Sequence, residues 1–155
     1  MKFNFFVVPA VIILTAYIGG RFTRKGIRDW YSHLKKPSWT PSGKTIGQIW
    51  TLLYLLTGFG ILWFWNVPVY GITHYVIGII LIVNAYLNAF WNKVFFVEHN
   101  FAKAYKWMIF LNATTILVIL LMLPKSFIAP VLLIPYVVWV GIATKLTKQI
   151  WHLNK

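Results

Sequence analysis

Four long stretches of the chain contain no Lys, Arg, Asp or Glu, and their lengths indicate membrane-spanning helices. Residues 3–20, 107–124 and 126–144 comprise 18, 18 and 19 residues, and residues 45–92 comprise 48. A helix needs about 20 residues to cross the hydrocarbon of a bilayer, so three stretches hold one span each and the longest holds two. Backbone groups in lipid must be paired within the chain, and for runs of this length that requirement favours helices.

The longest stretch is interrupted at residues 66–71, where Pro68 and Gly71 predict a turn. We therefore predict an all-α membrane protein, a five-transmembrane-helix bundle that forms one domain over residues 1–155. The spans are expected at about 3–20, 46–66, 74–92, 107–123 and 127–145. The first stretch is interpreted as a retained helix and not as a signal peptide, because no small-residue cleavage site precedes Arg21.

The composition agrees with a bilayer environment. Hydrophobic residues make up 59% of the chain and charged residues only 11%, whereas about a quarter of the residues in a soluble domain are charged. With five spans, 13 of the 15 basic residues fall on one side of the membrane and two on the other. Because cytoplasmic loops are enriched in Lys and Arg, we expect the N-terminus outside and the C-terminus in the cytoplasm, in a bacterial cytoplasmic membrane. Basic residues that punctuate apolar runs favour lipid headgroups over nucleic acid as partners.

Each predicted span carries one polar or aromatic residue at a similar depth below the basic side. At 1.5 Å per residue, these residues lie about 6–9 Å inside the nearest basic residue. They are Tyr17, Trp50, Asn88, Asn112 and Trp139, with Tyr54 and Asn84 one turn deeper. Tryptophans also concentrate at membrane surfaces, and asparagines also pair between helices, so both alternatives stay open. Together the residues favour an aromatic-walled cavity that opens toward the cytoplasm.

The loop at residues 21–44 is the only sizeable predicted segment outside the membrane. Ile27, Trp30, Tyr31 and Leu34 recur at helical spacing, which predicts a short amphipathic helix that ends before Pro37. This helix either covers the cavity or lies on the membrane surface without a ligand role.

The sequence lacks the residue patterns of conventional catalysis. Its two acidic residues, Asp29 and Glu98, lie in or beside separate loops, and it contains no cysteine. The four histidines fall in loops or at span ends, so we expect no haem ligand, no other metal site and no cofactor. Two kinds of function therefore remain possible: ligand binding, and chemistry carried out by indole rings.

Residues 26–41 read Gly-Ile-Arg-Asp-Trp-Tyr-Ser-His-Leu-Lys-Lys-Pro-Ser-Trp-Thr-Pro. This segment resembles the signature loop of the tryptophan-rich sensory protein and peripheral benzodiazepine receptor family, also called the translocator proteins (TspO/MBR). The similarity continues in order along the chain. It includes Gly19-Gly20-Arg21-Phe22, Ile49-Trp50-Thr51-Leu52-Leu53-Tyr54, Leu87-Asn88-Ala89-Phe90-Trp91 and Pro135-Tyr136-Val137-Val138-Trp139.

The resemblance implies a five-helix bundle that binds porphyrins and benzodiazepine- or isoquinoline-type ligands beneath the first cytoplasmic loop, and that forms homodimers. The ligand contacts it implies are Tyr31, Pro41, Trp50, Tyr54, Asn88, Phe90, Trp139 and Ala143. We add Asn84 to these contacts because it lies one turn deeper than Asn88 on the same span. We expect Arg21, Arg24 and Arg28 to pair with propionates and to steer anionic ligands inward. The family's sterol motif has a tyrosine where this chain has Lys148, so sterol transport is not carried over.

Three functions stay open at this point. The first is a membrane receptor or carrier for tetrapyrroles. The second is an enzyme that degrades porphyrin in light and oxygen, with Trp50 and Trp139 as the catalytic residues that the resemblance implies. The third is a dimeric scaffold without a small-molecule ligand, in which Ala85 and Ala89 let two copies of the third span approach closely.

Overall fold

The computed structural model describes residues 4–68 and 71–155. Within these residues it contains five long α-helices and one short 3-10 helix, as predicted for an all-α chain. Their bounds are α1 Asn4–Gly26, η1 Tyr31–His33, α2 Gly43–Asn66, α3 Ile72–Phe96, α4 Phe101–Met122 and α5 Ile128–Leu153. All five α-helices are long and apolar enough to cross a bilayer, which confirms the predicted five-helix membrane bundle. The predicted turn at residues 66–71 includes residues 69–70, and the first predicted span begins at residue 3. These positions lie outside the described residues.

Polar side chains fix the starts of two helices. The Ser42 hydroxyl accepts a hydrogen bond from the Thr45 amide at 3.1 Å, and the Asn100 side chain accepts one from the Lys103 amide at 2.9 Å. Such caps satisfy amides that have no partner inside the helix. Several helices extend beyond the predicted spans. The thickness of the hydrocarbon sets the length of the apolar segment, but the helix can continue past it. One example is α1, which continues six residues past residue 20 to Gly26.

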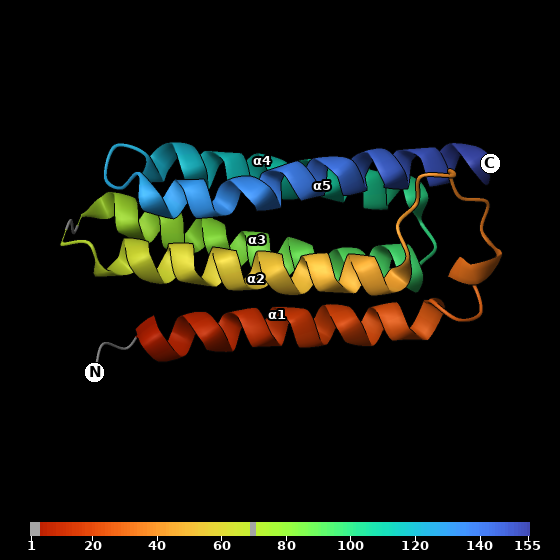
Figure 1. Ribbon diagram of the computed structural model, residues 1–155, viewed down its shortest axis with the longest axis horizontal. Coiled ribbons are helices and arrows are strands. Elements are labelled where there is room, and N and C mark those ends of the chain that lie inside the picture. The colour runs from red at the N-terminus through yellow and green to blue at the C-terminus, as the bar shows by residue number, and fades with distance from the viewer. Residues whose placement is uncertain (1–3, 69–70) are drawn as a thin grey trace.

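The five α-helices form a ring in which neighbours in space are often not neighbours in sequence. In the order α1–α3–α4–α5–α2 each helix packs against the next, and the α1–α2 contact that closes the ring is the least extensive. Figure 1 shows α1 along one edge of the bundle and α4 with α5 along the opposite edge.

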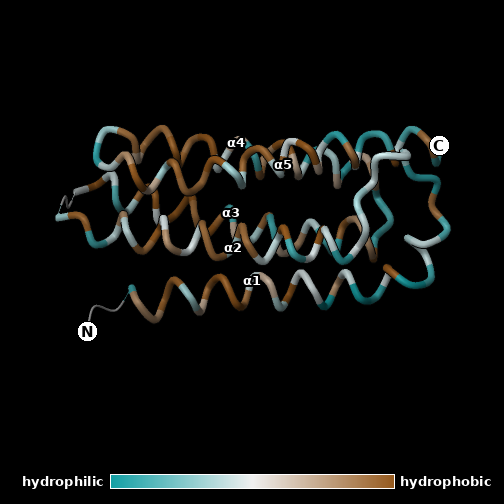
Figure 2. The backbone as a smooth tube through the Cα atoms, in the orientation of Figure 1, coloured by the Kyte–Doolittle hydropathy of each residue, from teal (hydrophilic) through white to brown (hydrophobic). Residues whose placement is uncertain are grey.

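The two ends of the bundle differ in character. We call the end formed by residues 26–43, 97–100 and 153–155 the basic end, and the end where α1 begins and α2 stops the opposite end. Figure 2 shows hydrophilic residues gathered toward the basic end, where the C-terminus lies. Among the described residues, the only Lys or Arg at the opposite end is Lys125, in the turn between α4 and α5.

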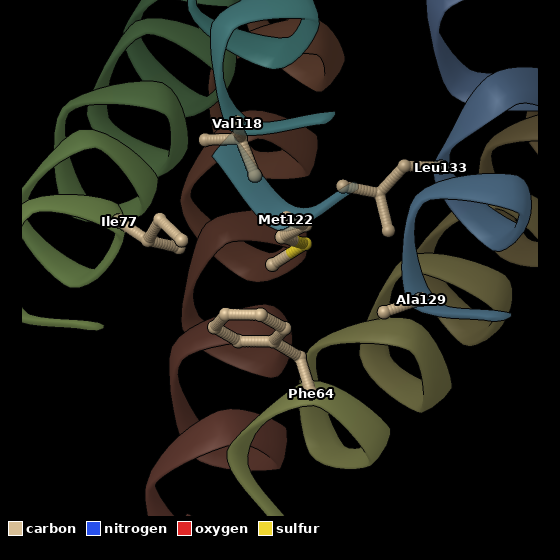
Figure 3. Close-up of a cluster of buried hydrophobic side chains, with 6 residues drawn as sticks. All are labelled: Phe64, Ile77, Val118, Met122, Ala129 and Leu133. Atoms are coloured by element: carbon tan, nitrogen blue, oxygen red, sulfur yellow. The ribbon is translucent and has the colours of Figure 1, made fainter. Parts of the chain in front are cut away.

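An aliphatic and aromatic core joins four helices near the opposite end. Phe64, Ile77, Val118, Met122, Ala129 and Leu133 are each at most 1% exposed and pack together (Figure 3). Deeper in the bundle, the Asn84 amide nitrogen of α3 donates to the Thr114 and Thr115 hydroxyls of α4 at 2.9 and 2.8 Å. Pairing between helices, one of the two alternatives for Asn84, is therefore realised.

The dimeric scaffold hypothesis was suggested by two small residues on the third span, and the structure does not place them on an exposed face. Ala89 is 3% exposed, and its Cα lies 3.8 Å from the position that a Cβ on Gly19 of α1 would occupy. This small residue therefore serves contact within one chain, and Ala85 lines a cavity. Ala85 and Ala89 do not form an exposed face on α3.

Candidate binding cavity

A cavity of about 370 Å³ lies inside the bundle next to the basic end. All five α-helices and the loop between α1 and α2 contribute to its wall. Small residues make room for it, because Gly19 and Gly20 of α1, Gly47 of α2 and Ala143 of α5 all line it. Its volume falls within the range of about 300–1,000 Å³ that is usual for small-molecule sites.

Three indole rings contribute to the wall, and they differ in their hydrogen bonding. Trp50, Trp91 and Trp139 all line the cavity. The Trp91 N–H donates to the Ala104 carbonyl at 3.1 Å, which fixes this ring against α4. The Trp139 N–H is buried but has no hydrogen-bond partner among the described residues. Buried donors are normally paired, so an unpaired N–H on a residue of the cavity wall is unusual.

Tyr54 and Asn88 form the floor of the cavity, and Tyr136 is hydrogen-bonded to Asn88. The Tyr54 hydroxyl donates to Asn88 Oδ1 at 2.7 Å, and Asn88 Nδ2 donates to the Tyr136 hydroxyl at 2.7 Å. The Trp50 ring packs on this floor, with ring centroids 5.7 Å from Tyr54 and 5.9 Å from Tyr136. Asn88, which is 4% exposed, thereby links α2, α3 and α5.

We expect Asn88→Leu to lower the free energy of unfolding by about 1 kcal/mol. The leucine removes two interhelical hydrogen bonds, and such bonds contribute on average about 0.6 kcal/mol each in membrane proteins. Thermal unfolding in detergent measures the change. Asn112→Leu is the control, because Asn112 Oδ1 has no partner to lose among the described residues. Equal stability of the two variants would contradict a bridging role for Asn88.

The loop between α1 and α2 covers the cavity at the basic end. In place of the predicted continuous helix, residues 27–30 form a turn and η1 follows. Its apolar side chains nevertheless pack inward on the cluster that contains Phe95 and Phe96, and Tyr31 contacts both rings at 6.0 and 5.5 Å. Burial raises the pKa of Tyr31, so its hydroxyl stays protonated at neutral pH and can donate to a ligand.

The end of α5 holds this loop in place. The Lys35 amide donates to Asn154 Oδ1 at 3.0 Å, and Asn154 Nδ2 donates back to the Lys35 carbonyl at 2.9 Å. Nearby, the Trp39 N–H donates to Gln149 Oε1 at 2.8 Å. The loop is therefore fastened to the end of α5 by polar contacts at the basic end.

The basic end carries a positive charge that its few acids leave largely uncompensated. All three predicted arginines are exposed, and Arg24 lines the cavity whereas Arg21 and Arg28 do not. Glu98 pairs with Lys103 at 3.0 Å and with Lys93 at 3.7 Å. The hydrogen bond from Lys103 holds the pKa of Glu98 below its usual range, although burial acts in the other direction. Anionic groups are attracted to such an end of the bundle.

The structure brings most of the predicted site residues together. Those that line the cavity are Arg24, Tyr31, Trp50, Tyr54, Asn88, Trp139 and Ala143. Others lie elsewhere. Asn84 lines a second cavity, and Phe90 packs between Phe22 and Tyr86 with ring centroids 5.7 and 4.6 Å away. Pro41 is not among the lining residues, and neither is Tyr17, whose side chain is 56% exposed.

The sequence reasoning missed several residues of the site, among them Trp91, Asn92 and Tyr136. Trp91 and Asn92 line the cavity, and Tyr136 accepts a hydrogen bond from Asn88 of its floor. Asn92 holds α1 against α3 by accepting a hydrogen bond from the Thr23 hydroxyl at 2.9 Å. A signal for Asn92 was present, because Asn84, Asn88 and Asn92 recur every four residues along one helical face. Tyr136 lies three residues before Trp139 and shares its face in the same way.

Five apolar helices around an indole-lined cavity define a multi-pass integral membrane protein with an internal small-molecule-sized cavity. The model of the TspO/MBR family matches residues 5–152, and the chain therefore belongs to the TspO/MBR family, as its sequence motifs predicted. It is 33% identical over 127 residues to the tryptophan-rich protein TspO of Bacillus cereus, with 82% of each chain covered. It is 31% identical over 148 residues to the tryptophan-rich protein TspO of Archaeoglobus fulgidus, with 92% of each covered. Identity to the human translocator protein is 28% over 144 residues, which cover 91% of this chain and 84% of the human one.

Proposed function

We propose that this protein is a membrane receptor or carrier that binds porphyrins, and benzodiazepine- or isoquinoline-type ligands, in the cavity beneath the α1–α2 loop. The observation that carries the proposal is Trp139, which lines the cavity and whose buried N–H has no hydrogen-bond partner among the described residues. A flat aromatic ligand with an acceptor atom satisfies this donor and packs on the surrounding indoles. Membership of the TspO/MBR family supports the same assignment.

The charge distribution supports entry from the basic end. Arg24 lines the cavity, and Arg21 and Arg28 lie on the neighbouring surface. Carboxylate-bearing tetrapyrroles are attracted to this end, with their carboxylates outermost and their rings directed toward Trp50 and Trp139. By the excess of Lys and Arg, the basic end faces the cytoplasm and the N-terminus lies outside, in a bacterial cytoplasmic membrane.

Titration with protoporphyrin IX, followed by quenching of tryptophan fluorescence in purified protein, tests the proposal. We expect saturable quenching that weakens about twofold to tenfold in Trp50→Phe and Trp139→Phe, because an aromatic pair contributes about 0.5–1.5 kcal/mol beyond burial. Trp63→Phe is the matched control, since Trp63 is 51% exposed and remote from this cavity. Unchanged affinity in both cavity variants would contradict the placement.

A second candidate function, light-dependent porphyrin degradation, is favoured by one observation. Trp50 contacts both Tyr54 and Tyr136, so three oxidisable rings adjoin the cavity. This function predicts that the main absorption band of bound protoporphyrin IX disappears under light and oxygen, and that Trp50→Phe slows its loss at saturating porphyrin. An equal rate with free tryptophan in detergent would assign the chemistry to the solution and not to the protein.

A further inference from the structure

A second and larger cavity, of about 650 Å³, lies between α1, α2 and α3 toward the opposite end. It follows the α1–α2 seam, where the ring of helices has its least extensive contact. Its wall on α1 extends from Asn4 to Thr15, which corresponds to a length of about 16 Å along the helix. Packed protein interiors leave few voids larger than a water molecule, so an elongated space of this volume calls for an occupant.

The two cavities are adjacent but separate. Tyr54 and Asn88 line both of them, and Tyr136 lines the second, so the hydrogen-bonded floor of the first cavity is also the inner end of the second. The side walls of the second cavity are aliphatic, with Val8 and Val11 from α1 facing Ile61 and Leu81. Among the described residues that line it, none carries a charge.

Two residues that line this cavity, Asn4 and Thr57, carry a buried polar side-chain atom without a hydrogen-bond partner among the described residues. Asn4 begins α1 at the opposite end of the bundle, whereas Thr57 lies one turn from Tyr54 at the polar inner end. Threonines in these helices usually donate to the carbonyl four residues earlier, as Thr15, Thr51 and Thr144 do at 2.7–3.0 Å. Thr57 lines the cavity, and its hydroxyl is buried and has no hydrogen-bond partner among the described residues. At this depth in a bilayer no bulk water is present to satisfy it, so a ligand atom is the natural partner.

We infer that this cavity is a second binding site, for an uncharged, elongated, lipid-like molecule with one terminal oxygen group that hydrogen-bonds Thr57. A long-chain alcohol or ketone has this chemistry. Its oxygen lies beside the polar inner end, and its chain extends along the α1–α2 seam toward Trp65. A phospholipid is a poor fit, because its charged headgroup would have to lie at the buried inner end.

A long-chain primary alcohol brominated at its far end tests the inference. Bromine quenches nearby indoles, and Trp65 lines the outer part of the cavity. We expect saturable quenching that is absent in Trp65→Phe and is weakened in Ala85→Leu, whose larger side chain narrows the cavity. Thr57→Val should weaken binding about threefold to tenfold, the equivalent of one hydrogen bond. Thr57→Ser should restore binding.

Controls separate this site from its surroundings and from the first cavity. Thr51→Val is the matched substitution on the same helix, at a threonine that lines neither cavity, and should leave alcohol binding unchanged. Protoporphyrin affinity should be unchanged in Thr57→Val, so failure of either proposal is distinguishable from failure of the other. Non-saturable quenching, or equal binding by Thr57→Val and the unmodified protein, would overturn the inference. The inference would also be overturned if Asn4→Leu weakened alcohol binding and Thr57→Val did not. The oxygen of the alcohol would then lie at the membrane surface.

Discussion

Gly26→Ala is expected to lower the free energy of unfolding by about 3 kcal/mol, at the upper end of the usual cost of overpacking. Gly26 is the last residue of α1 and is buried against the end of α3. A Cβ at this position would overlap the Phe96 carbonyl oxygen and lie 3.1 Å from the Phe96 Cβ. The overlap is with backbone, which cannot move aside as a flexible side chain does. The ends of α1 and α3 would therefore have to separate.

Thermal unfolding in detergent measures this cost, and Gly20→Ala on the same helix is the matched control. A Cβ on Gly20 meets only the end of the Arg24 side chain, at 3.7 Å. Because alanine is more favourable than glycine inside a helix by roughly 0.5–1 kcal/mol, Gly20→Ala should be neutral or slightly stabilising. Phe96 lines the first cavity, so Gly26→Ala should also weaken protoporphyrin binding. Equal stability of the two variants would show that the ends of α1 and α3 are not in close contact.

Asn154→Ala is expected to speed ligand release from the first cavity about tenfold. The substitution removes the two hydrogen bonds between Asn154 and the Lys35 backbone, which fasten the α1–α2 loop to α5. Each bond has a net contribution of about 0.5–1 kcal/mol, lost mainly from the closed loop, so the loss of two corresponds to roughly a tenfold change. Stopped-flow measurement of protoporphyrin dissociation gives the rate, and hydrogen exchange at the Lys35 amide reports loop opening without any ligand.

Asn66→Ala is the matched control for this prediction. Asn66 and Asn154 each donate to the carbonyl four residues earlier, at 2.7 Å in both cases, but Asn66 lies at the opposite end of the bundle. The control therefore removes the local bond without releasing the loop. Faster exchange at Lys35 with unchanged porphyrin dissociation would mean that the loop opens but does not limit release.

The number and order of helices could be predicted from the sequence because lipid imposes a simple rule. A span must be apolar over about 20 residues, so gaps between charges locate it. The same reasoning placed Trp50, Asn88 and Trp139 at one depth, and the structure places all three on the wall of one cavity. Depth does not fix the rotation of a helix, however. Tyr17 has the required depth but is 56% exposed on the outer surface of α1.

The loop shows a different limit of sequence reasoning. Its apolar spacing fits a helix, and the residues concerned do pack inward, with Trp30 stacked on His99 at 4.1 Å. The segment nevertheless has to turn back across the basic end and reach α2, and the contacts with α3 and α5 determine its path. Those contacts come from residues far away in sequence, such as Asn154 with Lys35, and no local pattern encodes them.

The circular order of the helices has a consequence for how the protein is made. Of its two neighbours in the ring, α2 packs more extensively on α5 than on α1, and α1 packs mainly on α3. A chain that emerges from the ribosome therefore inserts α2 well before its principal partner exists. Trp139, Ala143 and the loop-fastening Asn154 all lie in or directly after α5, which is synthesised after the other four helices. Nascent chains that stop short of α5 should reach the membrane without a closed ring, and hence without a binding cavity.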